Sequence, residues 1–266
     1  MTQRPFRDWF VQKSWAQLNK LLPARNAEPY AGTRRAGGKR ARAGNALAAF
    51  IAGELKREDK VSALKFDNMG VLFANIAGFT SFSRTLPPDA LALALNQIFS
   101  AFDDLVEKYG LEKIRTLGDA YMVVARHRLD SLVQLALDMV VVLRRYNAAN
   151  GTELAMRIGM HAGPTVAGVI GVKRFLYDVW GDTVTVAGRM QACGEPGAVH
   201  VSEAVYLQTR CHFDFSAREP IEVKGRGRMA TYWLLGPALQ PDPIARQRAK
   251  VMEIPPAWRG GAVLKA

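Results

Sequence analysis

The sequence contains very little cysteine, which removes two classes of small protein from consideration. Its 266 residues include only Cys193 and Cys211, and these two do not form a Cys-x-x-Cys pair. A disulfide framework or a cysteine-rich zinc module needs more cysteines in closer spacing, so both are excluded. The four histidines show no metal-ligand spacing either.

Long hydrophobic runs are also missing. The longest apolar stretch, Leu132 to Leu143, is interrupted by Asp138 and is shorter than the roughly 20 residues that a transmembrane helix needs. The first residues include Arg4, Arg7 and Trp9, where a signal peptide would need an apolar core. We therefore expect a soluble, cytoplasmic protein that is long enough to bury a sizeable core.

Basic side chains outnumber acidic ones, and nearly all of the excess lies at the two ends of the chain. The 36 Lys and Arg residues against 24 Asp and Glu residues give a net charge of +12. Residues 1–60 hold 13 basic and 5 acidic side chains, whereas residues 61–236 hold 18 and 17. A basic N-terminal arm permits contact with nucleic acid or a membrane surface, and this stays open for residues 1–44. We favour a solvated linker that joins a regulatory helix to the main domain.

The pattern of apolar, Pro and Gly residues divides the chain into three parts. Residues 1–44 are predicted to form an amphipathic helix over residues 6–22, followed by a basic, flexible linker. Residues 45–236 are predicted to form one domain. Residues 237–266 form a Pro-rich basic tail.

Strand and helix patterns alternate within the predicted domain. Its first half reads as a strand, a helix, a hairpin, a helix and a strand pair, at residues 69–76, 88–109, 113–125, 132–146 and 154–172. Its second half reads as a helix, a strand, a helix and three short strands, at residues 182–193, 200–202, 203–209, 213–215, 221–223 and 231–235. The opening order β-α-β-β-α-β predicts an α+β fold with a ferredoxin-like core, extended by C-terminal strands and helices.

Three segments carry candidate chemistry. A buried strand runs into Gly78 and then into a helix, and the backbone amides of such a turn favour phosphate. Asp119 lies at a tight hairpin tip, from which it can reach a metal beside that turn. Thr185 and Arg189 are four residues apart on one helix face, with Asp178 just upstream. Taken singly, each of these residues also has an ordinary structural explanation.

Taken together, in this order and spacing, the segments resemble the catalytic domain of the class III nucleotidyl cyclases over about residues 45–236. The likeness rests on Gly78-Phe79-Thr80, Leu117-Gly-Asp-Ala-Tyr-Met122, Arg157-Ile-Gly-Met-His161, Tyr177-Asp-Val-Trp-Gly181, and Lys224-Gly-Arg-Gly227 with Thr231-Tyr-Trp233. The resemblance implies an adenylate cyclase-like enzyme that converts ATP to 3′,5′-cyclic AMP and pyrophosphate. It also implies two divalent cations, Mg²⁺ or Mn²⁺, at a site shared across a head-to-tail homodimer.

The resemblance further implies a role for each candidate residue. One half of the site would contain the metal ligands Asn75 and Asp119, with the polyphosphate contacted by Arg157 and by the backbone amides of Gly78, Phe79 and Thr80. The other half would contain Arg115 and Asp178 for the base, Thr185 for the ribose, Arg189 for the α-phosphate, and Lys224 for the terminal phosphates.

This sequence departs from the family pattern at three of these positions. Asn75 replaces a metal-binding aspartate, and Thr185 replaces a ribose-orienting asparagine. Arg115 replaces a lysine that donates to adenine, but it still donates while Asp178 accepts, so ATP is favoured over GTP. Three outcomes stay open: a weak adenylate cyclase, an impaired nucleotide-binding or regulatory module that includes one half of a heterodimer, and a guanylate cyclase.

Overall fold

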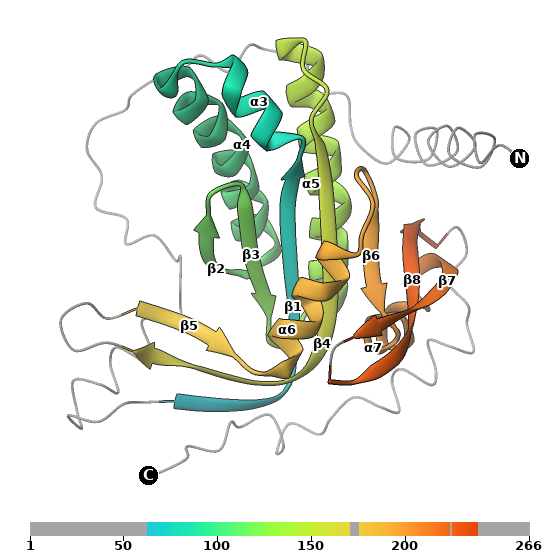
Figure 1. The fold of residues 1–266 in the computed structure, drawn as a ribbon. Coiled ribbons are helices and arrows are strands. Elements are labelled where there is room, and N and C mark those ends of the chain that lie inside the picture. The colour runs from blue at the N-terminus through green and yellow to red at the C-terminus, as the bar shows by residue number, and fades with distance from the viewer. Residues whose placement is uncertain (1–62, 171–175, 224, 239–266) are drawn as a thin grey trace, which may run out of the picture. The chain divides into compact units, whose positions relative to one another are not determined.

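The computed structural model describes residues 63–170, 176–223 and 225–238, and Figure 1 gives the labels of its elements. In chain order these elements are β1 (Ala63–Ala77), α3 (Phe79–Thr85), α4 (Pro88–Tyr109), β2 (Glu112–Leu117), β3 (Ala120–Ala125), α5 (Leu129–Asn150), β4 (Ala155–Ile170), β5 (Leu176–Trp180), α6 (Asp182–Ala192), β6 (Val199–Ser202), α7 (Glu203–Thr209), β7 (Phe213–Val223) and β8 (Gly227–Pro237). The predicted N-terminal helix, the linker, the C-terminal tail and Lys224 lie outside the described residues.

The sheet has the strand order β2-β3-β1-β4-β6-β8-β7, and β5 pairs with β4 beside this path. Strand β1 runs antiparallel to both β3 and β4, and β2 and β3 form the predicted hairpin. The four strands of the β-α-β-β-α-β unit therefore lie in the order β2-β3-β1-β4. This confirms the α+β fold with its ferredoxin-like core.

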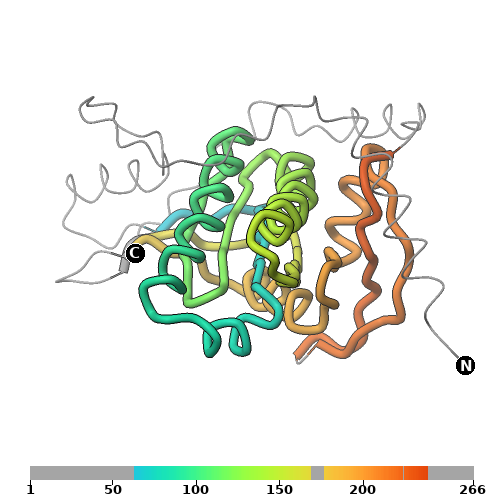
Figure 2. Tube along the Cα trace, turned by 90° about the horizontal axis from the view of Figure 1, so that it is seen from above, coloured from blue at the N-terminus to red at the C-terminus, as the bar shows by residue number. Residues whose placement is uncertain are grey.

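Helices α4 and α5 cover one face of the sheet, and α6 lies against the other face (Figures 1 and 2). Helix α5 has an apolar stripe that is buried along its length, at Leu132, Leu135, Met139 and Leu143. In α4, Ile98 and Phe102 are buried. No helix in the described ranges has the length and apolar character that crossing a membrane requires.

The alternation of side chains along β1 decides which residues face which layer. Leu72 and Ile76 belong to the core beneath α4 and α5. Val71 and Phe73 belong to the cluster on the opposite side, with α6. Because successive side chains of a strand point to opposite faces, Asn75 lies on the α6 face.

The predicted strand pair over residues 154–172 is wrong, because β4 continues through Pro164 without a turn. Strand β1 has a register shift between Phe66 and Met69, directly across from Pro164. A proline has no N–H group to donate to the ladder. A bulge in the partner strand interrupts the regular ladder at this position, so the missing donor is tolerated. A proline that looked like a turn signal is accommodated inside a continuous strand.

The two short strands predicted at residues 213–215 and 221–223 are also one strand, β7. Its pairing with β8 shifts register between Arg218 and Ile221, and Pro220 lies within that irregularity. Strand β5, which carries Asp178, was not predicted as a strand at all.

Candidate functional site

The two predicted metal-binding residues lie at the same end of the sheet. Asn75 pairs with Ala120 of β3 on one side and with Arg157 of β4 on the other. The backbone carbonyl of Asp119 accepts a hydrogen bond from the amide nitrogen of Ile76, 3.4 Å away. The hairpin tip is therefore adjacent to Asn75, and the structure gathers Asn75, Asp119 and Arg157 as the sequence predicts.

Arg157 is the cation of this group. It lies directly across from Asn75 on neighbouring antiparallel strands, where Cβ atoms are about 4.5–5.5 Å apart. Its Nε atom is buried and has no hydrogen-bond partner among the described residues. Because a buried polar group without a partner costs free energy, an anionic ligand at this end of the sheet would stabilise Arg157.

The metal donors at this end fit a divalent cation only when another ligand completes its coordination. Asp119 offers one carboxylate, and Asn75 offers one neutral amide oxygen. Among the described residues, no group of three or more His, Cys, Asp or Glu side chains could hold a metal. Mg²⁺ is commonly held by one or two carboxylates together with waters and substrate phosphates. The donors present therefore fit an ion that a bound triphosphate helps to hold.

Gly78 supplies the turn between β1 and α3. Its φ of 83° is a left-handed conformation that a side chain would strain, and it is the N-cap residue of α3. A Cβ atom at Gly78 would meet nothing within 4 Å, so the backbone conformation, and not lack of space, requires the glycine. The first amides of a helix, here those of Phe79 and Thr80, have no partner within the helix. Their contact with phosphate stays a prediction.

The structure joins the two predicted base-binding residues directly. Arg115 of β2 forms an ion pair with Asp178 Oδ2 of β5, and Asp178 Oδ1 accepts a hydrogen bond from its neighbour Val179 at 2.9 Å. Strand β5 pairs with β4, which brings Asp178 to the hairpin. Both oxygens of Asp178 therefore already have donors, whereas Arg115 is 48% exposed and keeps further N–H groups for a ligand.

Helix α6 presents the last predicted pair to solvent. Thr185 and Arg189 are exposed, whereas the residues between them, Val186 and Ala187, are buried against the sheet. No hydrogen bond or ion pair within the described parts of the chain links Thr185 or Arg189 to Asn75, Asp119 or Arg157. Within one chain, Thr185 and Arg189 are therefore presented to solvent and are not bonded to the residues predicted for the other half of the site.

Two residues that the sequence did not single out anchor the C-terminal end of α6. The ring of His200 donates from Nδ1 to the carbonyl oxygen of Met190 at 2.8 Å, and Arg218 donates to that of Cys193 at 2.7 Å. Gly159 of β4 permits the close approach of the helix, since a Cβ atom there would lie 1.9 Å from the backbone nitrogen of Gln191. In the sequence, His200 could be recognised only as a position expected to be buried in an alternating strand. Nothing in the sequence indicated the role of Arg218.

The buried histidines make the domain sensitive to acid. Burial lowers the pKa of His200 to about 4, with a further contribution from the nearby Arg218 guanidinium. Burial likewise lowers the pKa of His161, which bonds Ser202 at 2.7 Å, to about 4. Unfolded histidine binds a proton below about pH 6.5, whereas these folded-state rings do so only near pH 4. Their contribution to stability is therefore complete above pH 6.5 and is lost as the pH falls toward 4.

We expect the melting temperature to fall between pH 6.5 and pH 4, with roughly 3 kcal/mol lost per buried histidine. Thermal melts at half-unit pH steps would measure this loss for the wild type and for His200→Gln. The variant should lose less stability over that range, although it begins lower at pH 7. His127 is exposed, so His127→Gln should follow the wild-type curve. An equally steep pH dependence in His200→Gln would contradict this assignment.

Comparison with known proteins decides the family. The model of the adenylate and guanylate cyclase catalytic domain matches residues 61–236, which is most of the chain. The chain belongs to this cyclase family. Cyclases of the family generally depend on divalent cations.

Three of the similar cyclases show how far the likeness extends. An adenylate cyclase of Mycobacterium tuberculosis is 38% identical over 242 residues, which cover 88% of this chain and 52% of that protein. This chain thus spans about half the length of that relative. The solved catalytic core of a rhodopsin-guanylyl cyclase with converted specificity, in complex with ATPαS, is 31% identical with a TM-score of 0.62. The match covers 65% of this chain and 98% of that catalytic core.

A non-canonical dimeric guanylyl cyclase domain from Blastocladiella emersonii is 27% identical, with a TM-score of 0.60. The likeness covers 65% of this chain and 99% of that one. The family therefore includes relatives named for either purine nucleotide, and the choice of base has to be argued from this chain's own residues.

Proposed function

We propose that this protein is an adenylate cyclase that converts ATP to 3′,5′-cyclic AMP and pyrophosphate at a site shared by two copies of the chain. In this reaction the ribose 3′-oxygen forms a bond to the α-phosphorus and loses its proton. The bond from the α-phosphorus to the bridging oxygen of the β-phosphate breaks, and pyrophosphate leaves. The observation that carries the proposal is the orientation of α6, whose exposed face carries Arg189 while its buried face packs on the sheet. The metal-binding end is on the sheet, and Arg189 is on the exposed face of α6.

The metal-binding end would hold the triphosphate. Asp119 and Asn75 would bind up to two divalent cations, Mg²⁺ or Mn²⁺, together with the phosphate oxygens. Such ions, when bound, make the 3′-hydroxyl more acidic and neutralise the charge of the leaving pyrophosphate. Arg157 would contact the polyphosphate, because its unpartnered Nε lies beside Asn75. Gly78, Phe79 and Thr80 would add backbone amides to the same phosphates.

A second copy would supply the base and ribose contacts. Arg115 would donate to the acceptor N1 of adenine, and Asp178 would accept from the 6-amino group. Thr185 would orient the ribose, and Arg189 would neutralise charge that develops on the α-phosphate. Lys224, which lies outside the described residues, would reach the terminal phosphates. Because Arg115 and Asp178 bond each other in the structure, the base has to exchange part of that ion pair for its own hydrogen bonds.

A second candidate function is a nucleotide-binding or regulatory module with little turnover, or one half of a heterodimer. Asn75 favours it, because the amide lacks the charge that hard cations prefer. Thr185 favours it as well, because it is shorter than the asparagine of the family pattern and lacks an amide donor. These two residues belong to different halves of the site, so a simple division of labour with an intact partner is not evident. Guanylate cyclase activity is the remaining alternative, since Arg115 can also donate to O6 of guanine while Asp178 accepts from N1–H.

Cyclic-nucleotide formation by the full 266-residue chain tests these candidates. We expect cyclic AMP from ATP at a higher rate than cyclic GMP from GTP, and higher rates with Mn²⁺ than with Mg²⁺. The Asp119→Asn chain, prepared in the same way, sets the background because it retains no carboxylate at the metal-binding end. Absence of product with both nucleotides and both ions, with an ATP analogue still bound, would refute the enzyme and favour the binding module. Faster turnover of GTP would favour the guanylate cyclase.

A further inference from the structure

Asp103 of α4 binds both strands of the hairpin that carries Asp119. The hydroxyl group of Tyr121, in β3, donates a hydrogen bond to Asp103 Oδ1. The ammonium group of Lys113, in β2, lies 2.7 Å from Oδ1 and 3.0 Å from Oδ2 of the same carboxylate. One acidic side chain therefore fastens β2 and β3 to helix α4.

Packing around Tyr121 makes this attachment rigid. Its side chain is fully buried, and its ring centroid lies 5.5 Å from that of Phe99 and 5.6 Å from that of Phe102, both in α4. Lys113 Nζ lies 4.9 Å from the centre of the same ring. A shift of the hairpin would break all of these contacts at once.

The attached residues lie two positions from residues of the candidate site. Asp119 precedes Tyr121 by two positions, at the hairpin tip. Arg115 follows Lys113 by two positions, after a register shift in β2, and pairs with Met122 of β3. The side chain of Met122 belongs to the cluster on the α6 face. The hairpin is thus held from the α4 face while Arg115 reaches Asp178 on the opposite side.

We propose that Asp103 is a positioning residue, which holds the hairpin through Tyr121 and Lys113 so that Asp119 and Arg115 keep the places that metal and base binding require. The inference rests on the proposed cyclase function. Asp103 does not touch substrate, and it acts through the backbone of the hairpin. A misplacement of about 1 Å at reacting groups can lower a rate about a hundredfold, so even a small loosening of the hairpin should be measurable.

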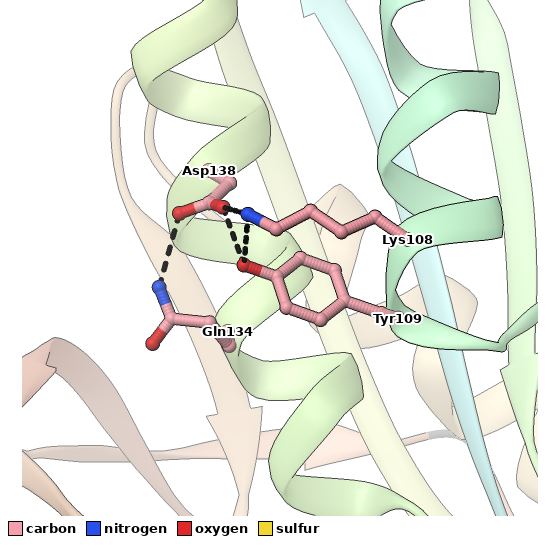
Figure 3. A network of polar contacts seen from close by, with 4 residues as sticks. All are labelled: Lys108, Tyr109, Gln134 and Asp138. Carbon is pink, nitrogen blue, oxygen red and sulfur yellow. Dashed lines mark hydrogen bonds and ion pairs between the residues drawn. The ribbon is translucent and has the colours of Figure 1, made fainter. Parts of the chain in front are cut away.

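A matched control exists on the same helix. The hydroxyl group of Tyr109, at the end of α4, donates a hydrogen bond to Asp138 of α5 at 2.6 Å, and Lys108 Nζ lies 3.6 Å from that carboxylate (Figure 3). Gln134 donates to the other oxygen of Asp138 at 3.0 Å. This second contact has the same chemical groups as the first, but it joins α4 to α5 and not to the hairpin. Loss of either tyrosine hydroxyl group removes one hydrogen bond to a carboxylate, and at Tyr109 it also removes the hydrogen bond from Lys108 at 3.2 Å.

The experiment compares Tyr121→Phe with Tyr109→Phe in the full chain. In Tyr121→Phe we expect the half-saturating Mn²⁺ concentration to rise about tenfold and kcat to fall by about tenfold or more. Backbone amide hydrogen exchange over residues 112–125 should become faster. In Tyr109→Phe we expect both kinetic constants within about twofold of the wild type and unchanged exchange in the hairpin, although its melting temperature should fall to a similar extent.

Two results would overturn the positioning role. One is hairpin exchange that is the same in Tyr121→Phe and Tyr109→Phe. The other is an equal kinetic effect of the two variants, which would mean that only global stability is involved. If the wild-type chain makes no cyclic nucleotide, the cyclase proposal fails by itself, and the exchange measurement still decides whether Asp103 holds the hairpin.

Discussion

Replacing Asn75 by aspartate is expected to raise kcat with Mg²⁺ by about a hundredfold, because one well-placed charge at a reacting phosphate is commonly worth a few kcal/mol. Position 75 is suitable for a second metal-binding carboxylate, since Asn75 lies on the α6 face of β1, directly beside Ala120 and close to Asp119. A second carboxylate there would give hard cations the charge that the amide lacks. Initial rates of cyclic AMP formation over a Mg²⁺ titration would show a higher maximum and a lower half-saturating concentration.

The neighbouring Arg157 gives this prediction a definite way to fail. The new carboxylate would lie across from Arg157, whose Nε has no partner among the described residues. An ion pair with Arg157 would make the carboxylate unavailable to a metal ion. In that case the variant would melt at a higher temperature with an unchanged Mg²⁺ dependence, which would contradict the metal-ligand role. Asn96 is exposed on α4, so Asn96→Asp makes the same chemical change away from the site and should leave the rates unchanged.

The fold was predictable from the sequence where hydrophobic periodicity is strong and local. The stripe of α5 and the continuous apolar run of β3 place their residues in the core, and the order of these elements gives the ferredoxin-like unit. The prediction failed at Pro164 and Pro220, which resemble strand ends in the sequence. Whether a proline ends a strand depends on the partner strand, and here the ladder is irregular opposite each one.

The candidate site was predictable only in part. The pairing of Asn75 with Arg157 follows from a long register between β1 and β4 that the sequence does not specify, although the cyclase resemblance assigned both residues. Asp178 was assigned to the base, but its ion pair with Arg115 depends on β5, which the sequence did not reveal. Asp103 escaped notice because its role comes from contacts 10 and 18 positions away in the chain.

Helix α6 provides the strongest argument for a shared site. Its sheet-facing residues fix its position against β4, where Gly159 permits a close backbone approach. Arg189 is consequently directed away from the sheet and is exposed, whereas Asp119 belongs to the hairpin tip beside Asn75. A reaction that needs both residues at one α-phosphate is therefore best served by two chains. In a two-fold dimer each interface contact occurs twice, so such a dimer would contain two equivalent sites.

Two inactive variants should therefore restore activity when they are combined. Asp119→Asn damages the metal-binding half and Arg189→Ala damages the other half, so each variant alone is expected to retain less than about 1% of wild-type activity. After co-expression, half of the dimers are mixed and each mixed dimer has one intact site, which predicts recovery of about a quarter of wild-type activity. Asp119→Asn combined with Arg157→Ala damages the same half in both chains and should recover nothing. Recovery in this second pair, or none in the first, would refute a site built from Asp119 of one chain and Arg189 of the other.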